Sequence, residues 1–216
     1  MKSQDIEGFF AALSAKNPHP VTELNYTNAY TLLVAVALSA QATDVAVNKA
    51  TADLFRKVST PQDMIDLGEE ALKQYIQTIG LYNTKARNVI KLSEQLIEDH
   101  AGQVPSTREA LEKLAGVGRK TANVVLNTIF KQPVIAVDTH IFRLGNRTGM
   151  APGKTPLEVE QKCMRVIPEK WLLHAHHWLI LHGRYICTAK KPKCDICPVY
   201  DFCGYKDKNN CAREKS

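Results

Sequence analysis

Four cysteines near the C-terminus constrain the fold of that end of the chain more than any other feature. Cys187, Cys194, Cys197 and Cys203 lie within 17 residues, in the pattern C-x6-C-x2-C-x5-C. A stretch this short can wrap all four sulfurs around one centre, so we expect a metal site. Because few apolar residues accompany the cysteines, the stretch is predicted to be rich in loops and to be held by metal rather than by a core of its own.

The spacing says less about which metal is bound. Structural zinc sites usually pair two short C-x2-C knuckles, and this stretch contains one. An iron–sulfur cubane is larger and tolerates longer loops between its ligands. The pattern therefore favours a [4Fe–4S] cluster over zinc and leaves both open. Two cysteines fall outside the pattern: Cys163 has the helical spacing of a core residue, and Cys211 lies in a polar tail with no evident role.

The overall charge favours a polyanionic partner. The chain has 216 residues, 44% of them hydrophobic, and a net charge of +6, so it can build one large core or two small ones and attract phosphates. Its N-terminus lacks the pattern of a signal peptide. Its longest apolar run, residues 32–38, is far below the roughly 18 residues of a membrane span. We therefore expect a soluble, cytoplasmic protein with no membrane partner, whose reduced cysteines bind metal rather than form disulfides.

Helix start signals recur along the chain. Residues 60–61 and 155–156 are threonine–proline pairs, which place a capping hydroxyl before a proline at the first helical position. Residues 106–109 match a capping box. Between these starts the apolar residues recur at helical spacing, as in residues 92–97. Only residues 133–137 look extended, and they are short enough to be a buried connector, so the predicted fold class is all-α.

A glycine-rich turn between two predicted helices suggests a grip on a DNA backbone. The turn and the start of the second helix contain Gly116, Val117, Gly118, Arg119 and Lys120. Glycines permit positive φ and let the backbone approach a ligand, and the start of a helix suits a phosphate. This is the helix-hairpin-helix arrangement, which holds DNA without reading its sequence. An ordinary tight turn is the alternative, and the two basic residues that follow it argue for DNA.

Lys120 is the candidate nucleophile. It falls in the first turn of the second helix, where the helix dipole disfavours the charged ammonium, and only an uncharged amine can attack. A solvated lysine or a phosphate contact is the alternative. Asp138, predicted to cap the next helix, is the candidate carboxylate that handles an electron-poor sugar or a proton, with capping alone as its alternative. A nearby carboxylate would favour the ammonium, so the sequence leaves the balance open.

Four stretches of the chain together resemble bacterial endonuclease III. They are residues 38–44, 114–125 and 137–140 and the four-cysteine loop. The resemblance covers nearly the whole chain in order, and no position that the family uses departs from its pattern. It implies a two-domain, all-α helix-hairpin-helix DNA glycosylase fold, with the DNA cleft between the domains. The expected domains are residues 22–132, and residues 1–21 plus 133–216 with a [4Fe–4S] cluster on the four cysteines.

The resemblance also implies the reaction. A bifunctional base-excision repair enzyme of this family removes oxidised pyrimidines and then cuts the strand at the abasic site by β-elimination. Lys120 matches the nucleophile, whose amine attacks C1′ of the sugar and forms a Schiff base, and Asp138 matches the catalytic carboxylate. The damaged nucleotide has to leave the stack first, because C1′ is shielded inside a duplex. The implied partner is double-stranded DNA containing damaged pyrimidines or abasic sites, bound by a monomer.

Several residues are expected to contact DNA. By resemblance, Gln41 fills the space that the extruded nucleotide leaves, and Leu81 is an apolar wedge opposite it; a helix cap and a core position are the respective alternatives. The full expected set is Gln41, Leu81, Gly116, Val117, Gly118, Arg119, His140, Lys190, Lys191 and Lys193. The last three lie between the first two cluster cysteines, in a loop that faces phosphates in this family, and a solvated charge run is the alternative.

Two rival functions and one rival site are also open. A monofunctional adenine or mismatch glycosylase shares the hairpin, the aspartate and the cluster, but such relatives generally lack a lysine at the position of Lys120. A non-catalytic DNA-binding module would use the hairpin and the metal loop only for grip. Four histidines near Trp178 could form a second metal site, although packing in a helix is the expected role; they are His174, His176, His177 and His182.

Overall fold

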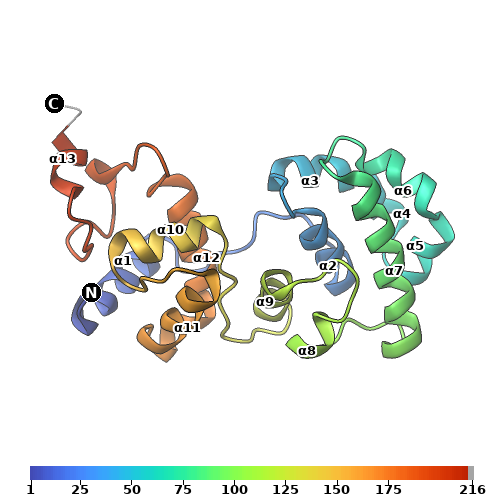
Figure 1. Cartoon of the computed structure of the whole chain (residues 1–216), viewed down its shortest axis with the longest axis horizontal. Helices are drawn as coiled ribbons and strands as arrows, with labels where there is room; N and C mark the ends of the chain where they lie inside the picture. Colours follow the sequence, from blue (N-terminus) through green and yellow to red (C-terminus); the bar gives the residue numbers. More distant parts are fainter. Residues whose placement is uncertain (214–216) are drawn as a thin grey trace. The chain divides into compact units, whose positions relative to one another are not determined.

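The computed structural model describes residues 1–213, and this part of the chain consists of helices and loops without a strand (Figure 1). The predicted all-α fold class is thus confirmed. The chain divides into two compact units, one formed by Thr22–Phe130 and the other by Met1–Val21 together with the chain from Lys131 onward. We refer to them as the hairpin unit and the cluster unit. The second boundary lies after Phe130, two residues before the one expected from the resemblance.

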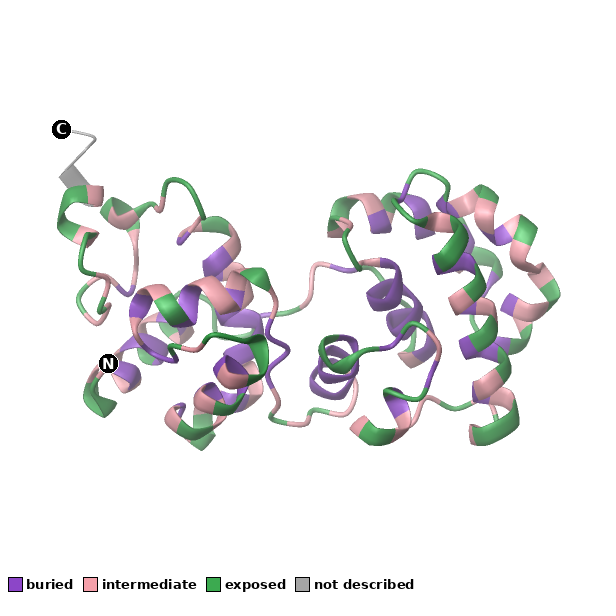
Figure 2. Cartoon of the chain, viewed as in Figure 1, coloured by how far each residue is buried: buried purple, intermediate pink, exposed green. Residues whose placement is uncertain are grey.

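The core of the hairpin unit is built around one apolar helix. Its helices are α2 (Ala29–Leu38), α3 (Asp44–Thr51), α4 (Leu54–Lys57), α5 (Pro61–Leu67), α6 (Glu69–Ile76), α7 (Tyr82–His100), α8 (Arg108–Leu111) and α9 (Arg119–Thr128). Every residue of α2 from Tyr30 to Leu38 is buried, as Figure 2 shows in purple. A helix that is apolar all round has to lie inside a core, and α7 and α9 pack against it. Among the described residues, no helix is long and apolar enough to cross a membrane.

The cluster unit joins the two ends of the chain. Its elements are α1 (Ser3–Lys16), α10 (Thr139–Thr148), α11 (Pro156–Val166), α12 (Glu169–Tyr185), the 3-10 helix η1 (Cys194–Ile196) and α13 (Lys208–Arg213). Phe9 and Phe10 of α1 pack edge to face, with ring centroids 5.5 Å apart, and Phe10 lies 6.3 Å from the Trp178 ring of α12. The N-terminal helix therefore completes a core whose other residues come from the C-terminal part. Cys163 is fully buried in that core, as predicted.

Two of the three predicted helix starts are confirmed. Thr60 caps α5 and Thr155 caps α11, and each accepts a hydrogen bond from the backbone N–H three residues further on. The third prediction was wrong by one residue, because Thr107 rather than Ser106 caps α8. Thr107 has the extended backbone of a cap, with φ −118° and ψ 147°, so the helix begins at Arg108.

Residues 131–138 connect α9 to α10 and form neither helix nor strand. Ile135 and Ala136 are fully buried, and Val137 is nearly so. The stretch that looked extended in the sequence is therefore a buried connector. It ends at Asp138, and its burial fixes where α10 begins.

Candidate active site and cluster site

The predicted hairpin lies between α8 and α9. Leu114 and Val117 are buried and anchor the turn, whereas Gly116 and Gly118 are exposed. Gly116 has a φ of +75°, and a Cβ added there would lie 3.0 Å from the Cβ of Asn88, so this position requires glycine. Gly118 has an ordinary φ of −98°, and a Cβ there would meet nothing within 4 Å. Glycine is therefore not required here by the backbone conformation, and the missing side chain leaves the backbone open to a ligand.

Gln95 of α7 holds the hairpin turn through both ends of its amide. Its Oε1 accepts the N–H of Ala115 at 2.8 Å, and its Nε2 donates to the carbonyl of Lys113 at 3.2 Å. Arg108 Nε donates to Asn123 Oδ1 at 2.9 Å and joins α8 to α9. The turn is thereby ordered before any ligand binds, which lowers the entropic cost of binding. Sequence reasoning missed Gln95, because its role depends on where α7 packs.

Lys120 is the second residue of α9, and its side chain is exposed. Gly118, the N-cap, supplies no side-chain hydrogen bond to the helix start. The position thus combines an accessible amine, the positive end of a helix dipole and an approach flanked by glycine. A lysine that attacks a bound substrate has to be accessible to it, and the Lys120 amine meets this condition. The side chain of Val117 is buried, so only its backbone is available for the predicted DNA contact.

Gln41 and Leu81, both in the hairpin unit, have left-handed backbone conformations, with φ of 55° and 62°. Residues other than glycine rarely adopt this conformation, and such outliers cluster at functional sites. Both are exposed, and Leu81 keeps 60% of its surface accessible, so the core alternative for Leu81 was wrong. The cap of α3 is Thr43, which accepts the N–H of Ala46 at 3.2 Å, so Gln41 is not needed as a cap.

Asp138 lies in the cluster unit and caps α10, as predicted. Its Oδ1 accepts the N–H groups of His140 and Ile141, each at 2.9 Å. The cap therefore uses one carboxylate oxygen and leaves Oδ2 outside it. Because two hydrogen bonds hold Oδ1, the orientation of the half-buried carboxylate is fixed by the helix.

The four predicted ligand cysteines line a single cavity, together with residues of α10 and α12. Cys187 is buried, the other three are half-buried, and none forms a disulfide. Within residues 1–213, no three His, Cys, Asp or Glu side chains are grouped tightly enough for a single metal ion. The sulfurs thus surround a space instead of meeting at one point. A cavity lined by four thiols fits the ligand set of an iron–sulfur cluster.

The cavity is a low-dielectric environment for its thiols. Burial raises the pKa of Cys194 to about 12 and that of Cys197 to about 11, so iron binding has to displace their protons. His182 Nε2 lies 3.7 Å from the Cys197 sulfur. Burial lowers the pKa of His182 to about 4, so the imidazole next to that sulfur is neutral at neutral pH.

Arg147 of α10 binds the first turn of the cysteine loop. Its Nη1 donates to the carbonyl of Thr188 at 2.6 Å, and its Nη2 donates to that of Ala189 at 2.9 Å. Nη1 also lies 3.5 Å from the Cys187 sulfur, and the guanidinium carbon lies 5.4 Å from the ring centroid of Tyr205. One cation therefore contacts the start of the loop and the ring of Tyr205, which follows the last of the four cysteines, and it can offset negative charge on the proposed ligands.

Arg143, one turn earlier on α10, fastens the same helix to α12. Its Nε donates to the carbonyl of Cys187 at 3.1 Å, and its Nη2 donates to that of Gly183 at 2.5 Å. A Cβ on Gly183 would lie 3.1 Å from the His140 carbonyl, so glycine allows the two helices to approach closely. The helix capped by Asp138 is thus attached to the cysteine loop. Sequence reasoning missed both arginines, although a spacing of four residues places them on one helix face.

Lys190, Lys191 and Lys193 are exposed in the loop between the first two cysteines. The backbone of this loop is ordered by hydrogen bonds, from the N–H of Lys193 to the carbonyl of Ile186 at 2.9 Å and from Thr188 Oγ1 to the carbonyl of Lys191 at 2.6 Å. An ordered loop presents its charges at a lower entropic cost than a free tail, which favours the predicted phosphate contacts over a solvated charge run.

The histidines of α12 pack as rings, which was their expected role. His176, His177 and His182 are buried. His174 lies 5.4 Å from Trp178, and His176 lies 5.0 Å from His177, measured between ring centroids.

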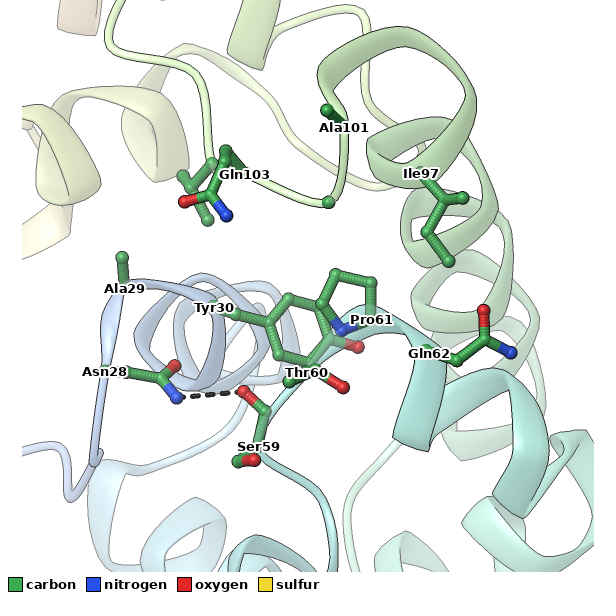
Figure 3. Close-up of a pocket in the computed structure, with 12 residues that line it drawn as sticks. Asn28, Ala29, Tyr30, Ser59, Thr60, Pro61, Gln62, Ile97, Ala101 and Gln103 are labelled. Carbon is green, nitrogen blue, oxygen red and sulfur yellow. Dashed lines mark hydrogen bonds between the residues drawn. The ribbon is translucent and has the colours of Figure 1, made fainter.

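A separate pocket of the hairpin unit contains none of the predicted site residues (Figure 3). It is lined by Asn28, Ala29, Tyr30, Ser59, Thr60, Pro61, Gln62, Ile97, Ala101, Gly102, Gln103 and Val104. Asn28 Nδ2 donates to the Ser59 carbonyl at 2.8 Å, and the Tyr30 hydroxyl is bonded to Ser93 at 2.6 Å. All the lining side chains are uncharged, so this pocket lacks the cations that a phosphate backbone requires.

Two family models match the chain. The model described as "HhH-GPD superfamily base excision DNA repair protein" matches residues 34–169, and that of the iron–sulfur binding domain of endonuclease III matches residues 187–203. The chain is 59% identical to the Endonuclease III of Escherichia coli (strain K12), over 91% of this chain and 93% of that protein. It is 58% identical to that of Haemophilus influenzae, over 96% and 98%.

Solved structures agree with these relatives. A trapped endonuclease III–DNA covalent intermediate has a TM-score of 0.90 and 43% identity, over 99% of this chain and 100% of that one. A non-covalent endonuclease III–DNA complex matches with the same values.

Proposed function

The chain belongs to the HhH-GPD superfamily of base-excision DNA repair proteins and, within it, to the endonuclease III family, and from this premise we propose how its residues divide the work. It is a DNA glycosylase and abasic-site lyase that acts on DNA and carries a [4Fe–4S] cluster. The observation that carries the assignment of residues is the exposed amine of Lys120 at a glycine-flanked helix start. A similar protein has been trapped in a covalent intermediate with DNA, which supports a nucleophilic residue.

Lys120 is the proposed nucleophile. Its neutral amine attacks C1′ of the extruded nucleotide, and the C1′–N bond breaks so that the base leaves with the electron pair. The amine then loses its proton and the sugar ring opens to a Schiff base. Removal of a proton from C2′ breaks the C3′–O bond and cuts the strand, and hydrolysis of the Schiff base restores the lysine.

Asp138 is the proposed carboxylate partner. Since Oδ1 is occupied by two backbone N–H groups, Oδ2 is the atom that stabilises the electron-poor sugar or accepts the proton of the attacking amine. The hydrogen bonds to Oδ1 hold the carboxylate in place during these steps.

The proposed DNA contacts divide into two kinds. Gln41 and Leu81, exposed on turns with positive φ, fill the space left by the extruded nucleotide. The phosphates are held in two ways. The hairpin contributes its backbone at Gly116, Val117 and Gly118, and cationic or polar side chains come from Arg119, His140 and the three loop lysines. The proposed lesions are oxidised pyrimidines and abasic sites in double-stranded DNA. The proposed form is a monomer in the cytoplasm of a bacterial-type cell, where chromosomal DNA is found.

Cys187, Cys194, Cys197 and Cys203 are the proposed cluster ligands, because they line one cavity. When bound, the cluster supplies iron–thiolate bonds that order residues 187–203. The arginines of α10 position this loop through its carbonyls, and the ordered loop presents its lysines.

The test compares Lys120→Ala with Lys113→Ala, a matched control at an exposed lysine of the same turn. On an abasic duplex we expect Lys120→Ala to lose at least about a thousandfold in strand scission while its Kd changes less than about threefold. Lys113→Ala should cut normally. Borohydride should trap wild-type protein on DNA through a peptide that contains Lys120. Cutting or trapping by Lys120→Ala at the wild-type rate would exclude this nucleophile.

Substrate class is tested on duplexes that carry thymine glycol, an abasic site or only normal bases. We expect base release and strand cutting on the first, cutting on the second and neither on the third. Release of normal pyrimidines at a similar rate would contradict the proposed preference for oxidised bases.

A further inference from the structure

Cys211, for which the sequence showed no evident role, lies beside the cluster cavity in the structure. It falls outside the matched iron–sulfur domain, which ends at residue 203. Its thiol donates to the carbonyl of Pro192 at 2.8 Å. Burial first of all, and then the nearby thiol of Cys211, raise the pKa of Cys194. A fifth cysteine therefore lies close to one of the four proposed ligand cysteines.

The helix that carries Cys211 is attached to the cysteine loop. Lys208 Nζ, at the start of α13, donates to the carbonyls of Tyr200 at 2.7 Å and of Cys203 at 2.9 Å. The Tyr200 hydroxyl donates to Asn209 Oδ1 at 2.5 Å. Contacts between α13 and η1, which contains Cys194, complete the attachment. The position of Cys211 therefore follows from several polar contacts to the loop and not from its thiol alone.

The arrangement around Cys194 leaves a second sulfur within reach of the same iron. Pro192 and Cys194 both line the cluster cavity, and Cys211 binds the Pro192 carbonyl from outside that lining. A shift of the short helix α13 would bring the Cys211 sulfur to the iron that Cys194 holds. Thiolates are the ligands that iron–sulfur clusters prefer.

We propose that Cys211 is a reserve ligand of the cluster, which binds the iron held by Cys194 when the Cys194 sulfur is lost. The inference rests on the four cysteines of the loop being the ligands. The step is a ligand exchange without electron transfer. The bond between iron and Cys194 breaks and the Cys194 sulfur leaves as a thiolate that takes a proton from water. The Cys211 thiol gives its proton to water, and its thiolate forms the new bond to the same iron.

The same geometry distinguishes Cys194 from the other half-buried ligands. Cys197 has His182 at 3.7 Å, and Cys203 accepts the N–H of Tyr205 at 3.5 Å. The hydrogen bond of the Cys211 thiol within the described residues goes to Pro192, two positions before Cys194. We therefore expect the reserve to serve Cys194 rather than Cys197 or Cys203, and this difference supplies the matched control.

The experiment uses the full chain, reconstituted anaerobically with iron and sulfide, as four variants: Cys194→Ala, Cys197→Ala, Cys211→Ala and Cys194→Ala with Cys211→Ala. The measurements are iron and acid-labile sulfide per chain, the visible absorption band, and alkylation of each cysteine read by mass spectrometry. We expect Cys194→Ala and Cys211→Ala to retain their clusters, and Cys197→Ala and the double variant to lose theirs. Cys211 should become protected from alkylation in Cys194→Ala.

Three outcomes would overturn the proposal. The first is loss of the cluster from Cys194→Ala. The second is a cluster content in the double variant equal to that of Cys194→Ala. The third is a cluster content in Cys197→Ala equal to that of Cys194→Ala. A second measurement avoids any change to the four ligands. The rate at which an iron chelator strips the cluster should be several-fold higher for Cys211→Ala than for wild type, because the reserve thiolate no longer recaptures the iron. Equal rates would contradict the proposal even if Cys194→Ala failed to fold.

Discussion

The hairpin of one unit and the cysteine loop of the other, both proposed to contact DNA, are held in place by different physical means. The hairpin is held by packing, since Leu114 and Val117 are buried beneath it and Gln95 binds its backbone. In the cysteine loop, residues 187–203, only Cys187 and Val199 are buried. This loop depends instead on arginine hydrogen bonds and on metal coordination. A core can hold a turn that two helices flank, whereas a loop with few apolar residues needs a strong point of attachment.

Removing iron should separate the two regions most strongly. After chelation we expect amide hydrogen exchange in residues 187–203 to accelerate at least about tenfold, because the loop loses the bonds that order it. The hairpin, residues 111–122, should keep its protection, because its core contains no metal ligand. Exchange measured by mass spectrometry on both forms tests this. Equal acceleration in the two regions would show that they do not differ in what holds them.

The cluster unit should also be the acid-sensitive one. Burial, first of all, and the nearby cations Lys131 and His174 lower the pKa of His177 to about 4, from a usual value near 6.5. A folded pKa below the unfolded one means that the unfolded chain binds more protons, so stability is complete above the unfolded value and falls as the pH falls from about 6.5 to about 4. Between about pH 7 and pH 5 this one group costs roughly 2 kcal/mol.

His177→Leu should therefore reduce the loss of unfolding free energy between those pH values by about that amount. Both tryptophans, Trp171 and Trp178, lie in the cluster unit, so their fluorescence in denaturant titrations reports on it. His100→Gln, in the hairpin unit, is the control for removal of a histidine outside the unit on which the tryptophans report. If the unfolding free energy of His177→Leu depended on pH as steeply as that of the wild type, His177 would not be the source of the acid sensitivity.

Substitutions at one supporting residue of each region should sharpen the contrast further. Gln95→Ala removes two hydrogen bonds from the hairpin, so we expect it to cost about 1 to 2 kcal/mol and to slow strand cutting, with iron content unchanged. Arg147→Ala should lower iron content and leave the protection of the hairpin intact. Arg147→Lys should restore little of the lost iron content, because an ammonium cannot reproduce the planar guanidinium that donates to two carbonyls. Iron assays and nicking rates on all three variants test the separation.

The smallest expected effect concerns the charges of the cysteine loop. Replacing Lys190, Lys191 and Lys193 with alanine should make the dependence of log K on log salt shallower, by up to about 0.9 for each phosphate that the variant no longer binds. Lys154→Ala, at an exposed lysine outside the loop, should leave the slope unchanged. Binding titrations across a range of salt concentrations measure it. A slope equal to that of the wild type would assign the three lysines to solvent.

Much of the candidate site could be predicted from the sequence, because its signals are local. The proposed ligand cysteines, the glycine turn before Lys120 and the cap at Asp138 each depend on residues only a few positions apart, and spacing and backbone preference act over that range. Local signals also fixed the all-α fold class. They placed the cap of α8 one residue too early, since adjacent Ser106 and Thr107 are both suitable caps.

Only the tertiary structure decided which distant residues support these local features. Gln95 contacts Ala115 across 20 residues, Arg147 reaches the Cys187 sulfur across 40, and Cys211 binds the Pro192 carbonyl across 19. None of these pairs has a local pattern, because each is created by how helices and loops pack. The exposure of Leu81 belongs to the same class, since a leucine in the sequence is equally compatible with a core and with a surface wedge. The sequence by itself determined the chemical groups, and packing determined what holds them in place.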